Sequence, residues 1–262
     1  MRAAIGYQPD LTPVLELAAD ELIFPVKVEQ GGAEYVALFH MRPYGERELI
    51  DFLDERAGEF TSKGRARLII EPSTKPGFTE LFDRYFVRLG GVEGDPSIEQ
   101  QKAWLARHER LKQRVIQEGY GGGEILAPEN EGVPHLHGLR LADITANRIA
   151  IGCTLWCEET SRAERVTVTH VLRAETPEDN RKYAQATGRL ENYTRKGTWK
   201  VLIDHAALCS LYDSMVEEVS GYVLDGAPCS PENKAAWLTL IPVWHKVAVI
   251  QEVFAGGSVK NG

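Results

Sequence analysis

The hydrophobic pattern of the chain is organised around residues 168–256, because the features of this stretch occur a second time nearer the N-terminus. "SLYDSMVEEVSGY" corresponds to the earlier "ELFDRYFVRLGGV", and "KVAVIQEVFAGG" corresponds to "KQRVIQEGYGGG". The matches keep their order: Asp83 and Asp213 lie 130 positions apart, and Trp104 and Trp237 lie 133 apart. The pattern predicts a tandem duplication with small loop insertions, giving two units of ordinary domain size.

Each unit opens with a predicted β-hairpin. Apolar and β-branched runs flank Gly31-Gly32, and this glycine pair is a hairpin signal. Pro25 inside the first run predicts an edge strand. In the second unit, "RVTVTHV" alternates and places Val166, Val168 and His170 on one face of a strand.

Helices are predicted after each hairpin. Thr176 and Pro177 form a helix start, since Thr caps helices well and Pro fits the first helical position. The second unit then reads as one long helix over about 199–220. Prolines interrupt the matching stretch of the first unit and leave a helix at about 77–89, ended by Gly90-Gly91.

The sequence therefore predicts an α+β fold of two similar tandem units. Each unit is expected to be a β-hairpin followed by three or four helices, and the two hairpins can share a small antiparallel sheet. The expected boundaries are an N-terminal arm at 1–20, a first unit at 21–118, a Gly/Pro-rich linker at 119–137 and a second unit at 138–262.

Composition narrows the functional classes. The chain has 262 residues, 43% hydrophobic and 26% charged, which is typical of a soluble globular protein. A formal charge of −8 argues against nucleic acid as a partner, since phosphate binding uses Lys/Arg-rich surface. No apolar run approaches the ~20 residues that cross a bilayer, and the N-terminus lacks a signal-peptide core. We therefore expect no membrane partner and a cytoplasmic location.

Candidate chemistry is sparse. The sequence contains no nucleophile elbow, phosphate-binding loop or dinucleotide fingerprint, so we expect no enzymatic activity and no cofactor. All four cysteines lie in the second unit and are expected to be free thiols. One alternative is a metal-binding or enzymatic accessory module that uses His135, His137, Cys153 and Cys157, although this spacing matches no compact zinc module.

Binding to a protein partner is the better-supported hypothesis. Arg42 and Arg173 both follow a hairpin, where they can form a salt bridge, cap a helix or contact a partner. The segment at 237–254 is more apolar than one helix face needs, so it either packs against the first unit or meets another chain. The candidate partner-binding residues are Arg42, Arg173, Trp237, Ile241, Trp244, Val247, Ile250 and Phe254.

Three motifs of the second unit carry a family resemblance: "HVLRAETPEDNRKY", "LYDSMVEEVSGY" and "IPVWHKVAVIQEVF". Together they resemble small tail-assembly proteins of phages and prophages, of the tail-assembly-chaperone type. The resemblance implies a non-enzymatic structural or assembly protein that binds tail components or itself, in the bacterial or infected host cell or within a virion. A host adaptor protein of the same fold is the other alternative.

Overall fold

The computed structural model describes residues 3–9, 12–30, 32–54, 59–62, 68–71, 78–119, 124–126, 146–187, 189–192 and 198–256. Helices and strands are interspersed throughout these ranges, and the strands form several small sheets. The predicted α+β class is confirmed, but the two predicted hairpins lie in separate sheets and do not share one.

The first half of the chain, residues 22–119, opens with a long antiparallel hairpin. β3 (Leu22–Gln30) and β4 (Ala33–Met41) pair along their whole length, as the apolar runs around the glycines predicted. Gly32 in the turn has φ +81°, a conformation that glycine adopts at little steric cost. The rest of this half comprises α1 (Glu46–Asp54), β5 (Glu59–Ser62), β6 (Leu68–Glu71), α2 (Phe78–Tyr85), β7 (Phe86–Gly90), α3 (Ile98–Leu105) and α4 (Glu109–Gly119).

The second half, residues 146–256, repeats this order of elements. Its hairpin joins β9 (Ala146–Cys157) to β10 (Arg162–Arg173), and the predicted alternation is observed, with Val166, Val168 and His170 buried on one face. The elements that follow are α5 (Pro177–Thr187), β11 (Arg189–Asn192), β12 (Thr198–Leu202), α6 (His205–Met215), β13 (Val216–Ser220), β14 (Tyr222–Leu224), β15 (Ala227–Pro228), the 3-10 turn η2 (Pro231–Asn233), α7 (Lys234–Leu238) and α8 (Val243–Gly256).

The two halves also share details of strand pairing. β7 pairs with β4 and β13 pairs with β10, and each ladder contains an irregularity next to its last pair, Met41 with Phe86 and Leu172 with Val216. Gly91 and Gly221 follow these strands with φ +73° and +80°. A tandem duplication stays our hypothesis for this repetition.

Two predicted helices are shorter than expected. In place of a helix over 199–220, the structure has β12, a helix from His205 to Met215, and β13. Asp204 caps α6 by accepting a hydrogen bond from the backbone N–H of Ala207, which sets the helix start. The helix predicted at 77–89 ends at Tyr85, and β7 follows. Pairing with β4 and β10 favours the strand conformation of β7 and β13 over continued helix.

The N-terminal arm is extended and forms part of a sheet. β1 (Ile5–Tyr7) and β2 (Pro13–Glu16) form a hairpin, and β2 runs parallel to β14 of the second half. Within the expected linker, β8 (Glu124–Leu126) pairs with β9, while 127–137 lie outside the described residues. The arm and part of the linker thus complete sheets whose other strands belong to the second half.

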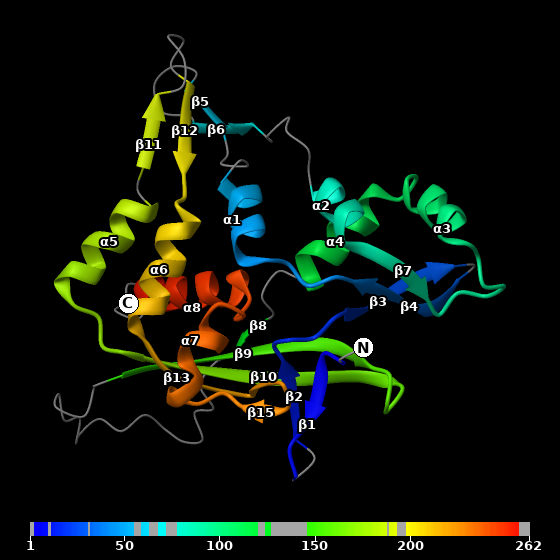
Figure 1. Ribbon diagram of the computed structural model, residues 1–262. Helices are drawn as coiled ribbons and strands as arrows, with labels where there is room; N and C mark the ends of the chain where they lie inside the picture. Colours follow the sequence, from blue (N-terminus) through cyan, green and yellow to red (C-terminus); the bar gives the residue numbers. More distant parts are fainter. Residues whose placement is uncertain are drawn as a thin grey trace, which may run out of the picture.

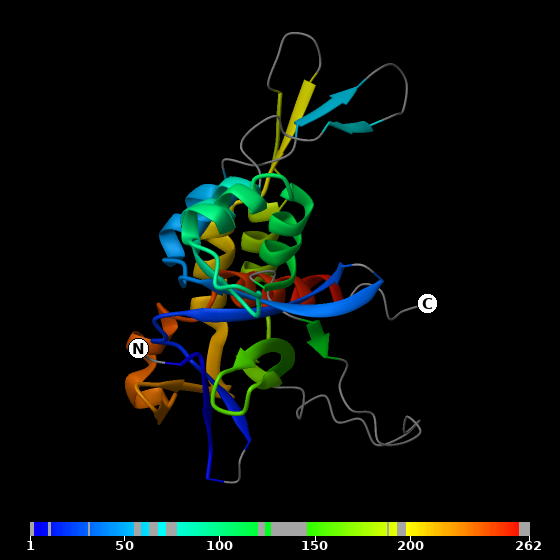
Figure 2. The same cartoon turned by 90° about the vertical axis from the view of Figure 1, so that its right-hand side faces the viewer.

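The long strands and the helices lie in separate layers (Figure 1). Helices α6 and α8 pack on the β9–β10 hairpin, and the small sheet of β1, β2, β14 and β15 lies on the other side of that hairpin. From left to right, Figure 1 shows α5, α6, α1 and α2 in a row. Four short strands project beyond the helices at the top of both views (Figures 1 and 2): β5, β6, β11 and β12.

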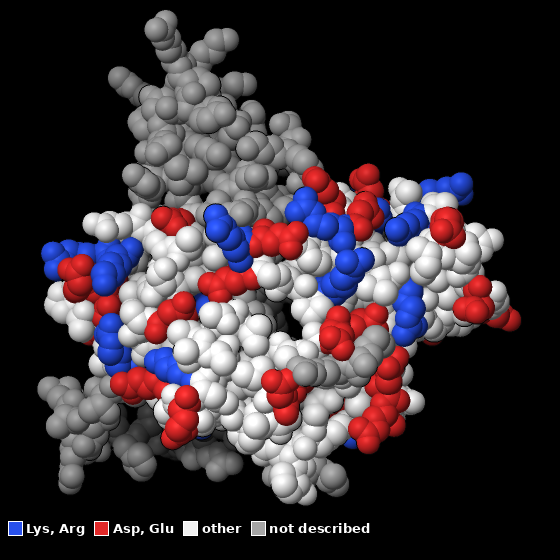
Figure 3. All heavy atoms as spheres, in the orientation of Figure 1, with Lys and Arg blue, Asp and Glu red and all other residues white. Residues whose placement is uncertain are grey.

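Acidic and basic side chains are interspersed over the face drawn in Figure 3, and no region of it is densely basic. The face is hollowed near its centre, where β2, α1, β9 and the α7–α8 turn approach one another in Figure 1. Among the described residues, no helix is long and apolar enough to cross a membrane.

Candidate functional site

A pocket of about 310 Å³ lies where the N-terminal arm meets both halves of the chain. We call it the junction pocket. Its walls come from five segments of the chain: residues 15–24, 43–49, Gly119, 153–155 and 239–245. Its volume falls at the lower end of the range of about 300–1,000 Å³ that is typical of ligand sites.

The lining of the junction pocket is mainly apolar. The arm and β3 contribute Leu17, Leu22 and Phe24, and the α7–α8 turn contributes Leu240 and Ile241, among others. Leu240 keeps 42% of its surface exposed. The pocket therefore offers apolar surface to a group from outside the chain.

Glu16 is the first of the charged residues in this lining. Its carboxylate accepts hydrogen bonds from the backbone N–H groups of Ala18, Asp225 and Gly226, at 2.9–3.1 Å. Asp225 and Gly226 form the β14–β15 turn with φ of +53° and +77°. Glu16 therefore fastens the arm to this turn, and its oxygens are already engaged.

Glu46, which also lines the pocket, forms an ion pair with Lys246 of the second half. Lys246 is fully buried, and its Nζ lies 2.8 Å from Oε2 of Glu46 and 3.0 Å from Oδ1 of Asp213. Burial raises the pKa of Asp213, and Lys246 opposes that shift. These three charges join α1 of the first half to α6 and α8 of the second.

The first half has a counterpart of this ion pair. Lys112 on α4 lies 2.5 Å from Asp83 on α2, and its side chain is only 7% exposed. Each lysine also lies over the aromatic ring that precedes its aspartate, Phe82 for Lys112 and Tyr212 for Lys246. The matched motifs "KQRVIQEGYGGG" and "KVAVIQEVFAGG" begin with these two lysines, but the sequence did not predict that they pair with the matched aspartates.

A buried chain of four polar rings extends inward from the pocket. His245 lines the pocket, and its Nδ1 lies 2.6 Å from the hydroxyl of Tyr222, which in turn lies 3.1 Å from Nε2 of His170. Nδ1 of His170 lies 2.6 Å from the hydroxyl of Tyr212. All four side chains are buried.

The hydrogen bonds between these four rings favour one order of donors and acceptors. A neutral imidazole donates through one nitrogen and accepts through the other. If Tyr212 donates to His170, His170 can donate to Tyr222, and Tyr222 can donate to His245, so both hydroxyl hydrogens have acceptors. The opposite direction leaves the hydroxyl hydrogen of Tyr212 without an acceptor among the described residues.

Burial keeps these four groups uncharged. It lowers the pKa of His170 to about 3, an effect to which the nearby His245 adds, and it lowers the pKa of His245 to about 4. Burial also raises the pKa of Tyr212 and of Tyr222 well above the usual value. A satisfied neutral network of this kind rigidifies the wall of the pocket.

The thiol in the pocket is also protonated at neutral pH. Burial raises the pKa of Cys153 to about 11, and its Sγ donates to the carbonyl oxygen of Val166 at 3.6 Å. Since the thiolate is the nucleophile and the metal ligand, this cysteine is poorly suited to either role. In contrast, Nε1 of Trp244 is buried and has no hydrogen-bond partner among the described residues.

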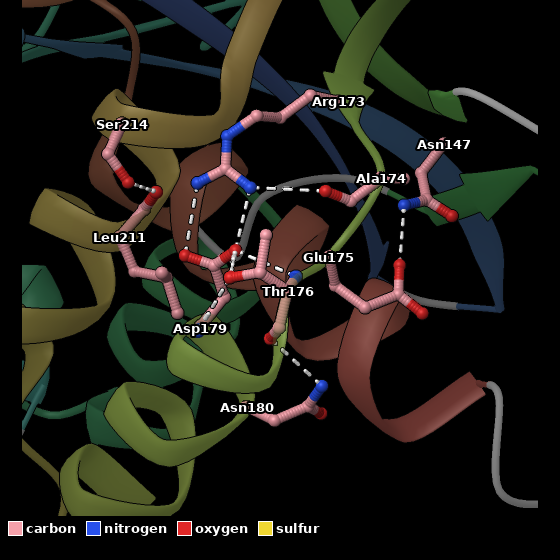
Figure 4. A network of polar contacts seen from close by, with 9 residues as sticks. All are labelled: Asn147, Arg173, Ala174, Glu175, Thr176, Asp179, Asn180, Leu211 and Ser214. Carbon is pink, nitrogen blue, oxygen red and sulfur yellow. Dashed lines mark hydrogen bonds and ion pairs between the residues drawn. The ribbon is translucent and has the colours of Figure 1, made fainter.

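Arg173 forms part of a helix cap. Its guanidinium makes a bidentate pair with Asp179, at 2.6 and 3.0 Å (Figure 4). Asp179 also accepts from the N–H and hydroxyl of Thr176, and the Arg173 guanidinium holds the pKa of that carboxyl well below its usual range. Arg173 therefore has the salt-bridge and capping role that was predicted as the alternative to a partner contact. At the equivalent position in the first half, the backbone N–H of Arg42 donates to the backbone carbonyl oxygen of Tyr85.

Most of the apolar candidates on the C-terminal helices lie in the core. Trp237, Ile241, Val247 and Ile250 are each at most 4% exposed, so they offer a partner almost no surface. Val247 and Ile250 lie on α8, which packs on α6, β9 and α1 and so places part of the apolar excess against the first half. Phe254 stacks on Tyr183 at 4.7 Å. Of the candidates, Ile241 and Trp244 line the junction pocket.

Of the four residues of the alternative metal site, His135 and His137 lie outside the described residues. Cys157 accepts a hydrogen bond from Tyr7 at 3.4 Å, while Cys153 donates to Val166. Within the described residues, no group of three or more His, Cys, Asp or Glu side chains could hold a metal ion.

Comparisons of the chain with protein-family models, with curated proteins and with solved structures found no match.

Proposed function

We propose that this protein is a non-enzymatic assembly protein of the phage or prophage tail type, and that it binds a partner protein through the junction pocket. The observation that carries the proposal is the pocket itself. Its walls are mainly apolar, and Glu16, Glu46 and Cys153 are already engaged with groups of the same chain. Such a site favours binding an apolar side chain over acid–base or nucleophilic chemistry.

The occupant we propose is an apolar side chain on an exposed segment of the partner. Leu240 on the α7–α8 turn and Trp244 on α8 line the pocket, together with Leu17 on the arm and Leu22 on β3. An aliphatic or aromatic group entering between them would remove apolar surface from water on both molecules. Full burial of such a side chain contributes about 1.5–3 kcal/mol.

The assignment to tail assembly rests on the resemblance of the three motifs in the second half. Two of them, "LYDSMVEEVSGY" and "IPVWHKVAVIQEVF", contribute Tyr212, Tyr222, Trp244 and His245, which form the pocket wall and the rings behind it. The location that accompanies this proposal is the cytoplasm of a bacterial or infected cell, or the assembled virion.

Affinity capture from cells in which a phage or prophage has been induced tests the proposal. Tagged wild-type protein is compared with Leu240→Glu, which places a charge in the pocket at an exposed position. Ile98→Glu is the matched control, because Ile98 is similarly exposed at 36% but lies outside the pocket. We expect wild type and Ile98→Glu to recover the same tail or virion component, and Leu240→Glu to lose at least ten-fold.

Recovery of no tail or virion component by the wild type would contradict the assembly role. Equal recovery by all three proteins would contradict the role of the pocket.

A further inference from the structure

The two short hairpins of the chain form one four-stranded sheet. β5 pairs with β6, β11 pairs with β12, and β12 pairs with β5, so the order is β11-β12-β5-β6 with every neighbour antiparallel. Each hairpin occupies the same place in its half, between the first and second helices. β5 and β11 start 130 positions apart, at Glu59 and Arg189, and β6 and β12 also start 130 apart, at Leu68 and Thr198.

The contact between the hairpins joins unlike strands. β12 is the second strand of its hairpin, and β5 is the first strand of the other. A two-fold arrangement would instead join like strands, first to first or second to second. The contact is therefore heterologous, and a heterologous contact leaves both of its surfaces available again at the two ends of the assembly.

The two edge strands of this sheet are the equivalents, in the other half, of the two strands that form the contact between the hairpins. β6, at one edge, is equivalent to β12, and β11, at the other edge, is equivalent to β5. Among the described residues, neither has a second strand partner. An unpaired edge presents a row of backbone N–H and C=O groups that can pair with another chain.

The contact between the helices of the two halves is also heterologous. α1 of the first half packs against α6 and α8 of the second, with Glu46 on Lys246. The matching site on the first half is the pair of Asp83 and Lys112, where the side chain of Asp83 is 57% exposed compared with 34% for Asp213. Figure 1 shows α5 and α2 at opposite ends of the row of α5, α6, α1 and α2.

We propose that copies of this chain associate head to tail, with the β6 edge of one copy paired to the β11 edge of the next. The pairing would repeat the antiparallel contact between β12 and β5. Thr198 faces Thr61 in the existing contact, and Leu68 and Glu191 lie 130 positions from these residues on the two edge strands. Repetition of one heterologous contact produces a ring or a filament.

This association is independent of the junction pocket, because the strands β6 and β11 contribute no residue to the pocket lining. The double variant L68C/E191C is treated with a short bismaleimide and compared with each single variant and with untreated and treated wild type. T61C/T198C reports the existing contact between β5 and β12 within one chain. Light scattering follows the mass of the wild type with concentration.

We expect L68C/E191C to give dimers and a ladder of larger products, at least ten-fold above the wild-type background, while T61C/T198C stays at the mass of one chain. The mass of the wild type should rise with concentration beyond that of a dimer. L240E should cross-link as well in the double-cysteine background as the parent does, which separates this association from the function of the pocket.

Dimers from L68C alone would show that β6 meets β6 in a two-fold contact, and they would overturn the proposal. A wild-type mass of one chain at every concentration, with no cross-linked product from L68C/E191C, would also overturn it.

Discussion

Lys246 is the residue on which the contact between the two halves most depends. It has no exposed surface and lies between two carboxylates, one from each half of the chain. A buried ammonium group requires such partners, because desolvation of an unpaired charge costs several kcal/mol. Removal of the ammonium would leave Glu46 and Asp213 next to each other without a cation.

We expect Lys246→Met to lower the free energy of unfolding by about 3 kcal/mol. Removing one partner of a buried ion pair costs about 3–5 kcal/mol, and the partial exposure of both carboxylates places the loss at the low end of that range. Urea unfolding measures it. Lys112→Met is the matched control and should lose about 1 kcal/mol, because Asp83 is more exposed. Equal losses would contradict the role of Lys246.

The two buried histidines should make stability depend on pH. Their pKa values, about 3 for His170 and about 4 for His245, lie below the value of about 6.5 for an unfolded histidine. The unfolded chain therefore binds more protons in this range. The stabilisation is complete above about pH 6.5 and is lost as the pH falls toward 4, at about 1.4 kcal/mol per pH unit for each histidine.

His245→Asn tests this linkage. An amide oxygen at this position can still accept the hydrogen bond from Tyr222, but it does not titrate. Urea unfolding at pH 7.5 and pH 5 should show a difference for the variant that is smaller by about 2 kcal/mol than for the wild type. An identical difference in the two proteins would show that His245 is not buried in the neutral form.

Among the elements, the two strand ends at Gly91 and Gly221 depend most on local backbone geometry. Both glycines have positive φ, and a Cβ at Gly221 would lie 2.3 Å from the carbonyl oxygen of Thr167. Gly226 has a similar φ of +77°, but no atom lies within 4 Å of its added Cβ. Gly226 therefore isolates the cost of the backbone conformation from the cost of the clash.

We expect Gly226→Ala to lower the free energy of unfolding by about 1 kcal/mol, the cost of a left-handed conformation. Gly221→Ala should lose more than about 2 kcal/mol, because the Cβ would also clash with the β10 backbone. Chemical denaturation of both variants measures the difference. A Gly221→Ala loss no larger than that of Gly226→Ala would contradict the geometry.

Local signals predicted the elements that are set by local chemistry. The paired apolar runs around Gly32 gave β3 and β4, and Thr176 with Pro177 gave the start of α5. The helix expected over 199–220 was wrong because its ends belong to β12 and β13, which pair with strands distant in sequence. A helical reading of residues 216–220 cannot include hydrogen bonds supplied by β10.

The candidate site was predicted only in part, for a similar reason. The apolar excess at 237–254 led to Ile241 and Trp244, which line the junction pocket, but it also led to Val247 and Ile250, which are core residues. Periodicity shows that a face is apolar and does not show what covers it. Glu16 and Tyr44 join the pocket from segments more than 190 residues away from α8, and no pattern in the sequence connects them.

At the scale of the molecule, the two halves are joined by the junction pocket and by a buried ion pair. The junction pocket takes residues from both halves, and Lys246 contacts α1 and α6 together. We therefore expect one cooperative unfolding transition, with far-UV and near-UV circular dichroism giving the same midpoint in urea. Two separated transitions, one for each half, would show that the halves are stable independently.

The most direct test of the proposed function is photo-cross-linking from the pocket in induced cells. A photoreactive phenylalanine replaces Leu240, and the matched protein carries it at Ile98, outside the pocket. We expect position 240 to cross-link to one tail or virion protein through an apolar residue, and position 98 to give no such product. The absence of a product specific to position 240 would contradict binding through the junction pocket.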